Sequence, residues 1–299
     1  IGLSLPPAYL ADRPARRAWL ETLGDPGPAL RALREAGVGS VELRSVGQGT
    51  DPSLALDAAC QVRDAGLALT IHGHLPSPAH GETFAELYPS LAPLARALLE
   101  WGCESLLTVH SHSAEGLAVE ELAGSTVRAL RTVAAALENE HIPLRIALEN
   151  DRRRARPSPG VTYDGILAII DRVASPRVGA CWDFGHAYAN VRQGQLELVP
   201  PAGFLRRVIH THIHDLGPAT HHPLTCGTVP LELFLDRLLA AGYEGLLNLE
   251  LSPERFEGGP AGDLVYASIE RLAGCLGRPT GPENTEATLA HRLQGWTGG

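Results

Sequence analysis

The chain has 299 residues, of which 44% are hydrophobic and 20% are charged, a composition typical of globular proteins. Its 34 acidic and 25 basic residues give a net charge of −9, which disfavours a nucleic-acid partner because phosphate backbones bind basic surfaces. No apolar stretch approaches the roughly 18 residues that a membrane span needs, so we expect no membrane partner.

The sequence lacks the signals of a nucleotide site and of secretion. It contains no lysine, which excludes a P-loop, and Pro6-Pro7-Ala8 follows the first apolar run where a dinucleotide-binding fold has a glycine-rich loop. We therefore expect no nucleotide cofactor. The first residues lack the basic start and apolar core of a signal peptide, and the five cysteines have no regular spacing, so we expect a cytoplasmic protein with reduced thiols.

Short apolar runs alternate along the chain with longer amphipathic segments. The runs begin about 35 residues apart on average, which accommodates one strand, one loop and one helix per repeat. In chain order, we expect strands at residues 2–5, 40–43, 67–71, 105–109, 144–148, 178–182, 208–213 and 246–249. Helices are expected between them, with examples at residues 28–36, 53–65, 84–101, 117–139, 164–173 and 231–241.

This alternation predicts an α/β fold. Near-continuous apolar runs are typical of parallel strands that are buried on both faces. Eight repeats fit a single (β/α)8 barrel, the TIM barrel, over residues 1–276. The alternative, a doubly wound open sheet, is disfavoured because its glycine-rich loop is missing. Residues 277–299 are rich in Gly, Pro and Thr and are expected to form a tail or a capping segment.

Polar residues follow the apolar runs at the end where TIM barrels carry their chemistry. Four of them come from the ends of the fifth to eighth strands and should converge at one mouth: Glu149, Asp183, His212 and Glu250. Three neighbouring carboxylates repel one another unless a cation neutralises them. Carboxylates with an imidazole suit Mn²⁺, Mg²⁺, Co²⁺ or Zn²⁺, so we expect a divalent-metal site. The alternative is four separate, salt-bridged barrel residues.

Ten of the 13 histidines lie at or just beyond the ends of the third, fourth, sixth and seventh strands. Four of these, His72, His110, His186 and His221, could bind substrate hydroxyls around one metal or hold additional metal ions, and we favour substrate contact. The remaining strand-end histidines include four that are expected to lie in loops outside the site: His74, His112, His214 and His222.

An arginine-rich segment, residues 151–156, follows the fifth strand on the same side of the barrel. We expect Arg152 to bind a phosphate or carboxylate of the substrate, because guanidinium groups bind such anions with two parallel hydrogen bonds. A solvated basic loop is the alternative.

Several of these segments occur in an order that is typical of one superfamily. They are Ala147-Leu148-Glu149-Asn150, Cys181-Trp182-Asp183-Phe184-Gly185-His186, His212-Ile213-His214-Asp215, the later residues 221–227 and Leu249-Glu250. With them, the chain resembles the xylose isomerase-like TIM barrels, which include sugar and sugar-phosphate isomerases and epimerases and the endonuclease IV group. Such barrels often pair through their helical faces, so a homo-oligomer is compatible with the resemblance.

The resemblance implies roles for individual residues. Glu149, Asp183, His212 and Glu250 correspond to the shared metal ligands of the superfamily. His186 corresponds to a residue that touches substrate in the epimerases and binds a further metal in the endonucleases. His72 and His110 match the two histidines of the first endonuclease zinc. His221 matches a ligand of the third zinc, but the acidic companion of that ligand is replaced here by Ala219.

The implied function is a divalent-metal-dependent sugar or sugar-phosphate isomerase or epimerase. It would act through a metal-stabilised enediolate, with Glu149 and Glu250 as the acid and base. The alternative is a multinuclear zinc phosphoesterase of the endonuclease IV kind, which the acidic charge and His110-Ser111-His112 in place of His-Pro-Gly disfavour. A third alternative is a barrel that holds a metal without catalysis.

Overall fold

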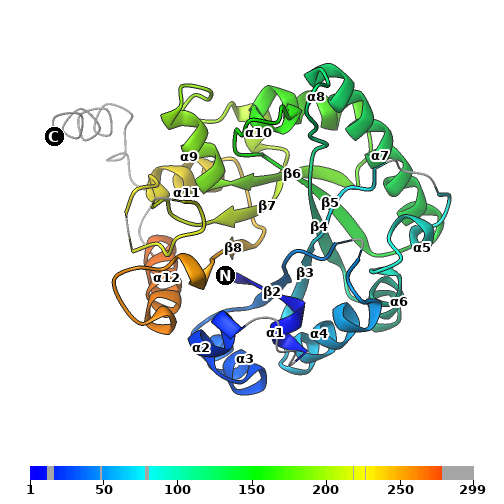
Figure 1. The fold of residues 1–299 in the computed structure, drawn as a ribbon. Helices are drawn as coiled ribbons and strands as arrows, with labels where there is room; N and C mark the ends of the chain where they lie inside the picture. Colours follow the sequence, from blue (N-terminus) through cyan, green and yellow to red (C-terminus); the bar gives the residue numbers. More distant parts are fainter. Residues whose placement is uncertain (12–16, 48, 78–80, 218, 226, 278–299) are drawn as a thin grey trace.

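Eight parallel strands form a closed barrel in chain order, with β8 hydrogen-bonded back to β1 (Figure 1). The computed structural model describes residues 1–277 except residues 12–16, 48, 78–80, 218 and 226. The strands are β1 (Gly2–Leu5), β2 (Ser40–Leu43), β3 (Ala68–His72), β4 (Ser105–His110), β5 (Leu144–Glu149), β6 (Val178–Asp183), β7 (Val208–Ile213) and β8 (Leu247–Leu249).

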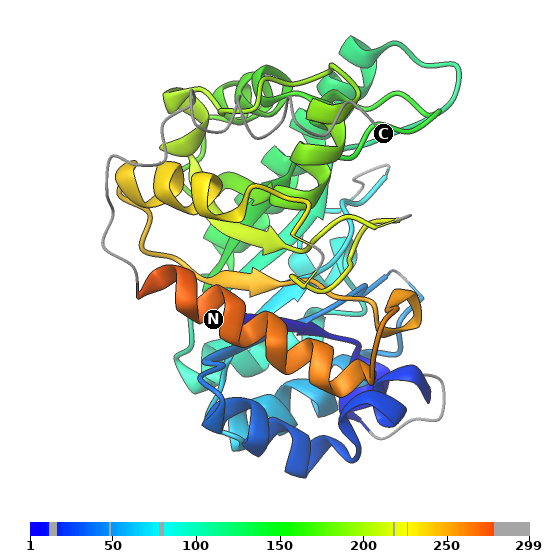
Figure 2. The same ribbon diagram turned by 90° about the vertical axis from the view of Figure 1, so that its left-hand side faces the viewer.

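Helices surround the barrel on the outside, and the loops that follow the strands gather at one end (Figures 1 and 2). In the first half they are α1 (Pro7–Leu10), α2 (Arg17–Leu23), α3 (Pro26–Glu35), α4 (Pro52–Asp64), α5 (Phe84–Leu87), α6 (Ala92–Trp101) and α7 (Val119–Asn139). In the second half they are η2 (Pro159–Val161), α8 (Tyr163–Val173), α9 (Phe184–Arg192), α10 (Ala202–Leu205), α11 (Leu231–Ala240), η3 (Pro253–Arg255) and α12 (Ala261–Leu276). Among the described residues, no helix is both long and apolar enough to cross a membrane.

The predicted fold class is confirmed, and every predicted strand agrees with the structure to within one residue at each end. The helix predicted over residues 84–101 is wrong in one respect, because it is interrupted between α5 and α6. Tyr88 precedes Pro89 and adopts φ −134° and ψ 67°, since the proline ring disfavours the helical conformation in the residue before it. The predicted tail falls on residues 278–299, which lie outside the described part of the chain.

A cluster of aromatic side chains packs the outer face of the barrel beneath α11. Trp182 in β6 lies with its ring centroid 4.4 Å from that of Phe184 and 5.0 Å from that of Phe234 in α11. All three side chains are fully buried. Since Trp182 and Asp183 are neighbours on one strand, the tryptophan points outward while the aspartate faces the barrel axis. The cluster therefore holds in place the strand end that carries Asp183.

Phe234→Ala is expected to lower the free energy of unfolding by about 3–5 kcal/mol, because it leaves a cavity among buried rings that cannot all move to fill it. Leu239→Ala is the matched control in the same helix, since Leu239 is 36% exposed. Urea unfolding of both variants measures the difference. Equal losses would contradict the packing role of the cluster.

Candidate functional site

The four predicted metal ligands lie at the carboxyl ends of neighbouring strands. Glu149 ends β5, Asp183 ends β6, His212 is the penultimate residue of β7 and Glu250 directly follows β8. Their side chains are buried at the mouth of the barrel. The closed barrel therefore brings together residues that are up to about 100 positions apart in the chain, as expected for a site at this end of a TIM barrel.

His212 lies between the two glutamates. Its Nδ1 atom is 3.3 Å from Oε2 of Glu149 and 3.4 Å from Oε2 of Glu250. Asp183 joins this group through His186, whose Nδ1 atom is 3.4 Å from Oδ2 of Asp183 and 3.2 Å from Oε1 of Glu149. The Asp183 side chain also accepts a hydrogen bond from the backbone N–H of His186 (2.6 Å) and so caps α9. One carboxylate thus fixes the start of the helix that carries His186.

The second group of predicted histidines surrounds the same two glutamates. Nε2 of His72 lies 3.4 Å from Oε2 of Glu149, and Nε2 of His110 lies 3.5 Å from the same oxygen. On the other side, Nε2 of His221 lies 3.3 Å from Oε2 of Glu250. Donor atoms of His72, His110 and Glu149 all lie within 4.8 Å of one another, as do those of His72, His212 and Glu250.

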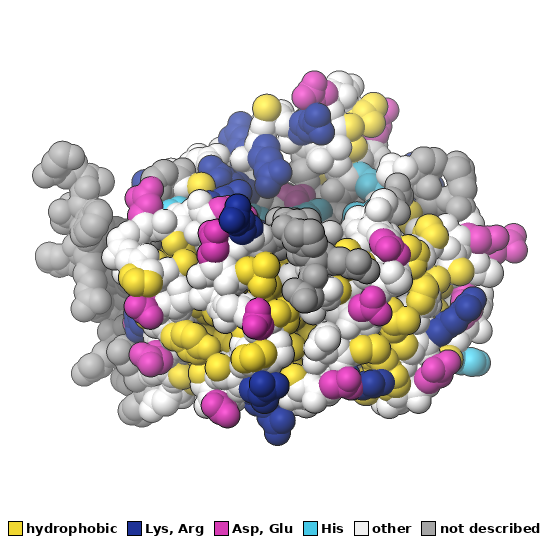
Figure 3. All heavy atoms as spheres, turned by 60° about the horizontal axis from the view of Figure 1, so that its bottom comes forward, with side chains coloured by type: hydrophobic (Ala, Val, Ile, Leu, Met, Phe, Trp, Pro, Cys, Tyr) yellow, Lys and Arg dark blue, Asp and Glu magenta, His cyan; other side chains and the backbone are white. Residues whose placement is uncertain are grey.

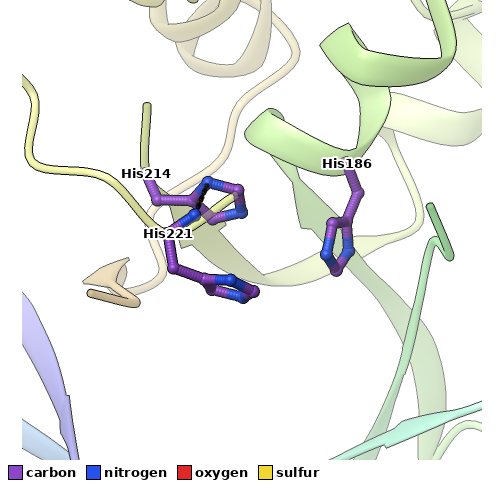
Figure 4. Close-up of side chains that lie close together, drawn as sticks. All are labelled: His186, His214 and His221. Atoms are coloured by element: carbon purple, nitrogen blue, oxygen red, sulfur yellow. Dashed lines mark hydrogen bonds between the residues drawn. The ribbon is translucent and has the colours of Figure 1, made fainter. Parts of the chain in front are cut away.

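His214 corrects the expectation that it lies in a loop outside the site. It is fully buried, and its Nε2 atom is 3.1 Å from Oδ1 of Asp183. Nδ1 of His214 accepts a hydrogen bond from the backbone N–H of His221 (3.0 Å; Figure 4), so Nε2 carries the proton that points to Asp183. His214 lies in the site because it follows His212 by two residues, and side chains two residues apart share one face of an extended chain.

The other histidines expected outside the site have different partners. Nδ1 of His74 hydrogen-bonds with the carbonyl of Val46 (3.2 Å). The two ring nitrogens of His112 lie within hydrogen-bond distance of the Ser125 hydroxyl and the Pro76 carbonyl. His222 is buried in the loop that follows β7, where its backbone pairs with that of Asp215.

The cluster contains buried polar atoms that make no hydrogen bond with any described residue. They are Oε1 and Oε2 of Glu149, Oε2 of Glu250, Nδ1 of His212 and Nε2 of His186. A buried oxygen or nitrogen without a partner is costly, so such atoms are rare unless they bind a ligand or an ion. Two carboxylates and two imidazoles that converge in this way fit a divalent cation.

The two glutamates are held in their charged form. Burial alone would raise the pKa of Glu149, but the imidazoles of His110 and His212 outweigh burial and hold that pKa well below its usual value. Burial likewise opposes the charge of Glu250, whose pKa is held well below its usual value by Arg44, His212 and His221. Nε of Arg44 lies 3.0 Å from Oε1 of Glu250. Both side chains are therefore ionised and able to bind a cation.

A buried carboxylate lies beneath the site, inside the barrel. Glu42 in β2 is fully buried and accepts hydrogen bonds from Nε2 of His212 (3.0 Å), Nε2 of His210 (3.0 Å) and the Ser4 hydroxyl (2.7 Å). Because the Nε2–H of His212 is directed at Glu42, Nδ1 is the nitrogen that faces Glu149 and Glu250. Glu42 thus sets which nitrogen of His212 is available to a metal, as carboxylates behind metal-binding histidines commonly do.

His110 is oriented by Asp151, the first residue of the loop after β5. Nδ1 of His110 lies 2.7 Å from Oδ1 of Asp151, and Oδ2 of Asp151 accepts from the Ser111 hydroxyl (2.8 Å). Burial lowers the pKa of His110, but Glu149 and Asp151 outweigh burial and raise it to about 10. Asp151 therefore holds the His110 ring through Nδ1, which leaves Nε2 on the opposite edge of the ring facing Glu149.

Arg152 lies at the rim of the site. It lines a cavity of about 410 Å³ whose other lining residues include His110, His186, Arg154 and Arg156. A second cavity of about 260 Å³ is lined by Arg152 together with residues of α9 and of the loop after β7. Figure 3 shows a hollowed face with histidine and acidic side chains inside it and arginines gathered on one side of its rim.

A family model described as the xylose isomerase-like TIM barrel matches residues 30–275 of the chain. The chain belongs to the xylose isomerase-like TIM barrel family. A relative described as a putative hydroxypyruvate isomerase of Streptomyces coelicolor is 29% identical over 240 residues, which are 74% of this chain and 84% of the relative.

Two solved structures show how the fold of this xylose isomerase-like barrel recurs. D-Allulose 3-epimerase from Methylomonas sp., solved with D-allulose, is 16% identical with a TM-score of 0.64, and the match covers 91% of this chain and 96% of the epimerase. An AP endonuclease of family 2 from Brucella melitensis is 17% identical with a TM-score of 0.59, and the match covers 83% and 92% of the two chains. At these identities, the likeness is one of fold.

The sequence pattern did not assign three residues that the xylose isomerase-like barrel places around the cluster: Glu42, Arg44 and Asp151. Glu42 carried a signal, since it is an acidic residue within a strand that is otherwise buried and uncharged. Arg44 and Asp151 follow the ends of β2 and β5, but nothing local indicates their partners. Arg44 reaches across to the backbone carbonyl of Leu251, 207 positions away in the sequence (2.8 Å).

Proposed function

We propose that the protein is a divalent-metal-dependent isomerase or epimerase of sugars or sugar derivatives. The observation that carries the proposal is the pair of ionised, buried carboxylates, Glu149 and Glu250, that face His212 from two sides. No described residue donates a hydrogen bond to the oxygens that face His212. The family, the relative described as a hydroxypyruvate isomerase and the fold likeness to D-allulose 3-epimerase support it.

We assign the metal to Glu149, Asp183, His212 and Glu250. When bound, a divalent ion supplies Lewis-acid stabilisation of the negative charge that develops on a substrate oxygen. Asp183 is oriented for this role by the Nε2–H of His214, and His212 is oriented by Glu42. Each of the two ligands is thus held by a second residue behind it, which reduces the freedom lost on binding.

Glu149 and Glu250 exchange protons with the substrate carbon. Arg44 holds one oxygen of Glu250 at 3.0 Å, whereas in the described part of the chain no arginine pairs with Glu149 and neither of its oxygens accepts a hydrogen bond. We therefore assign removal of the proton from carbon to Glu149 and its return from the other side to Glu250. His72, His110 and His186 surround Glu149 and position the substrate hydroxyls.

Deuterium uptake from D₂O tests the proposal. Protein stripped of metal and reloaded with Mn²⁺, Co²⁺, Mg²⁺ or Zn²⁺ is expected to introduce deuterium beside the carbonyl of a ketose, and the stripped protein is not. Reloading is also expected to raise the thermal unfolding midpoint, because a ligand at 100 times its Kd adds about 2.7 kcal/mol of stability. Metal binding without exchange in a panel of ketoses and their phosphates would overturn the assignment.

One observation favours a second candidate, a zinc phosphoesterase. His72, His110 and Glu149 form a compact donor set of their own, suited to a separate zinc ion. The third set, His186 with His214 and His221, is less suited to a cation. The guanidinium group of Arg255 lies 3.1 Å from Nδ1 of His221, and Nε2 of His214 is directed at Asp183 rather than toward the other two histidines. Cleavage of an abasic-site duplex by the zinc-loaded protein, without ketose exchange, would favour this candidate.

A further inference from the structure

We infer that the substrate carries an anionic group, a phosphate or a carboxylate, at the end remote from its reacting carbonyl, and that Arg152 and Arg154 bind this group. The inference rests on the proposed function and narrows its substrate class to sugar phosphates and sugar acids. It is carried by a cavity that both the arginines and two histidines beside Glu149 line, by the lack of acidic partners for Arg152 and Arg154 among the described residues and by the fixed position of their loop.

The cavity of about 410 Å³ is lined by two chemically different groups of residues. His110 and His186 lie 3.5 Å and 3.2 Å from oxygens of Glu149. The lining also includes Arg152, Arg154 and Arg156, together with Ser113, Glu115 and Asp151. A substrate whose reacting carbon lies at Glu149 would therefore extend toward the arginines. A volume of this size is within the usual range of small-molecule sites, and a three-carbon acid would leave much of it empty.

The charges of these arginines are not all balanced by described carboxylates. Arg156 pairs with Glu115 (3.3 Å), and Asp151 is already engaged by His110 and by the Ser111 hydroxyl. Arg152 and Arg154 have no carboxylate within 4.0 Å among the described residues, although acidic residues outnumber basic ones in the chain. Unpaired guanidinium groups beside a cavity attract anions and bind phosphate or carboxylate oxygens in a fixed geometry.

The loop that carries these arginines is held by buried groups, which argues against a merely solvated basic segment. Asn190 in α9 is fully buried; its side-chain oxygen accepts from the backbone N–H of Arg153 (2.8 Å) and its nitrogen donates to the carbonyl of Asp151 (2.8 Å). The backbone N–H of Asp151 donates to the carbonyl of Gly160, which closes the loop. Arg152 thus extends from a backbone fixed to the same helix that presents His186, as positioning of an anion requires.

Matched pairs of substrates test the inference. We expect wild-type protein to use D-ribulose 5-phosphate or D-fructuronate with a kcat/KM at least about tenfold above that for D-ribulose or D-fructose. The Arg152→Gln, Arg154→Gln double variant is expected to lose about 10- to 100-fold for the anionic member of the preferred pair and little for the neutral one. A loss confined to the ribulose 5-phosphate pair indicates that the arginines bind a phosphate, and a loss confined to the fructuronate pair indicates that they bind a carboxylate. Arg152→Lys should lose less activity toward the anionic substrate than Arg152→Gln, because lysine keeps the positive charge but cannot form two parallel hydrogen bonds with the anion.

Arg206→Gln is the matched control, since Arg206 is an exposed arginine just before β7, at the opposite end of the barrel. Calorimetric titration of the wild type and the double variant with inorganic phosphate gives a readout that needs no turnover, and binding should be weakened only in the double variant. Equal use of neutral and anionic ketoses by both proteins would overturn the inference and leave the proposed function intact. Loss of all exchange, with phosphate binding still dependent on the two arginines, would instead overturn the proposed function.

Discussion

Glu149→Gln is expected to reduce the rate of solvent-proton exchange by about 10²- to 10⁴-fold, at saturating metal, for the substrate epimer whose proton Glu149 removes. The amide has the size of the carboxylate but cannot accept a proton from carbon at neutral pH. Exchange is measured by the appearance of deuterium beside the carbonyl, and metal content is measured in the same samples. Because Glu149 is also an assigned metal ligand, the rates are compared only at metal concentrations where occupancy of wild type and variant is equal.

Two further variants make this comparison specific. Glu254→Gln, at an exposed glutamate four residues after Glu250, is expected to retain the wild-type rate. Glu250→Gln is expected to impair exchange too, and in an epimerase each glutamine variant should still exchange the proton of one epimer, because the other glutamate serves that face. A Glu149→Gln protein that keeps its metal and stays within tenfold of the wild-type rate for both epimers would refute the assignment of Glu149 as the base.

Glu42→Gln is expected to weaken metal binding by about 10- to 100-fold, although Glu42 itself is not an assigned ligand. Glu42 accepts the Nε2–H of both His210 and His212, and burial of its charge is outweighed by these imidazoles, which hold the pKa of Glu42 low. The carboxylate also accepts from the Ser4 hydroxyl and the Asn248 side-chain amide through its second oxygen. An amide offers one acceptor oxygen instead of two, so it cannot satisfy both imidazoles and these two donors at once. His212 would then lose the partner that directs Nδ1 toward Glu149 and Glu250.

Competition of Mn²⁺ or Zn²⁺ binding against a coloured chelator measures this affinity without any substrate. Glu35→Gln, at an exposed glutamate in α3, is the control with the same change of charge. Thermal unfolding of both variants in the presence of a chelator separates loss of the fold from loss of the site. An affinity equal to that of wild type in a folded Glu42→Gln protein would show that Glu42 does not position His212.

The barrel itself could be predicted because its signal is local. Each strand is an uninterrupted apolar run, and the repeat length leaves room for one helix, so strand number and direction follow without knowledge of any long-range contact. The same rule located the site. Parallel strands present their carboxyl ends at one mouth, so Glu149, Asp183 and Glu250 had to lie near one another once the barrel was accepted.

Sequence reasoning failed where a residue's role depends on a partner from a distant strand. His214 was expected in a loop outside the site. In the structure, the loop after β7 folds back, so that Nδ1 of His214 accepts a hydrogen bond from the backbone N–H of His221 and Nε2 of His214 reaches Asp183. A spacing of two residues predicts that two side chains lie on the same face of the chain, but it does not predict which residues from other strands contact that face. Similarly, the partner of Arg44 is Glu250, more than 200 positions away, and no local pattern links the two.

The sequence by itself determined the eightfold repeat and which end of the barrel carries the acidic and histidine side chains, because both follow from periodicity and from the polarity of single strands. Only the tertiary structure decided that Glu42 lies beneath His212, that His214 supports Asp183 and that the arginine loop is fixed by Asn190. The physical reason is closure of the barrel. Hydrogen bonds of buried groups must be satisfied by whichever strand faces them across the interior, and that pairing does not exist until the last strand joins the first.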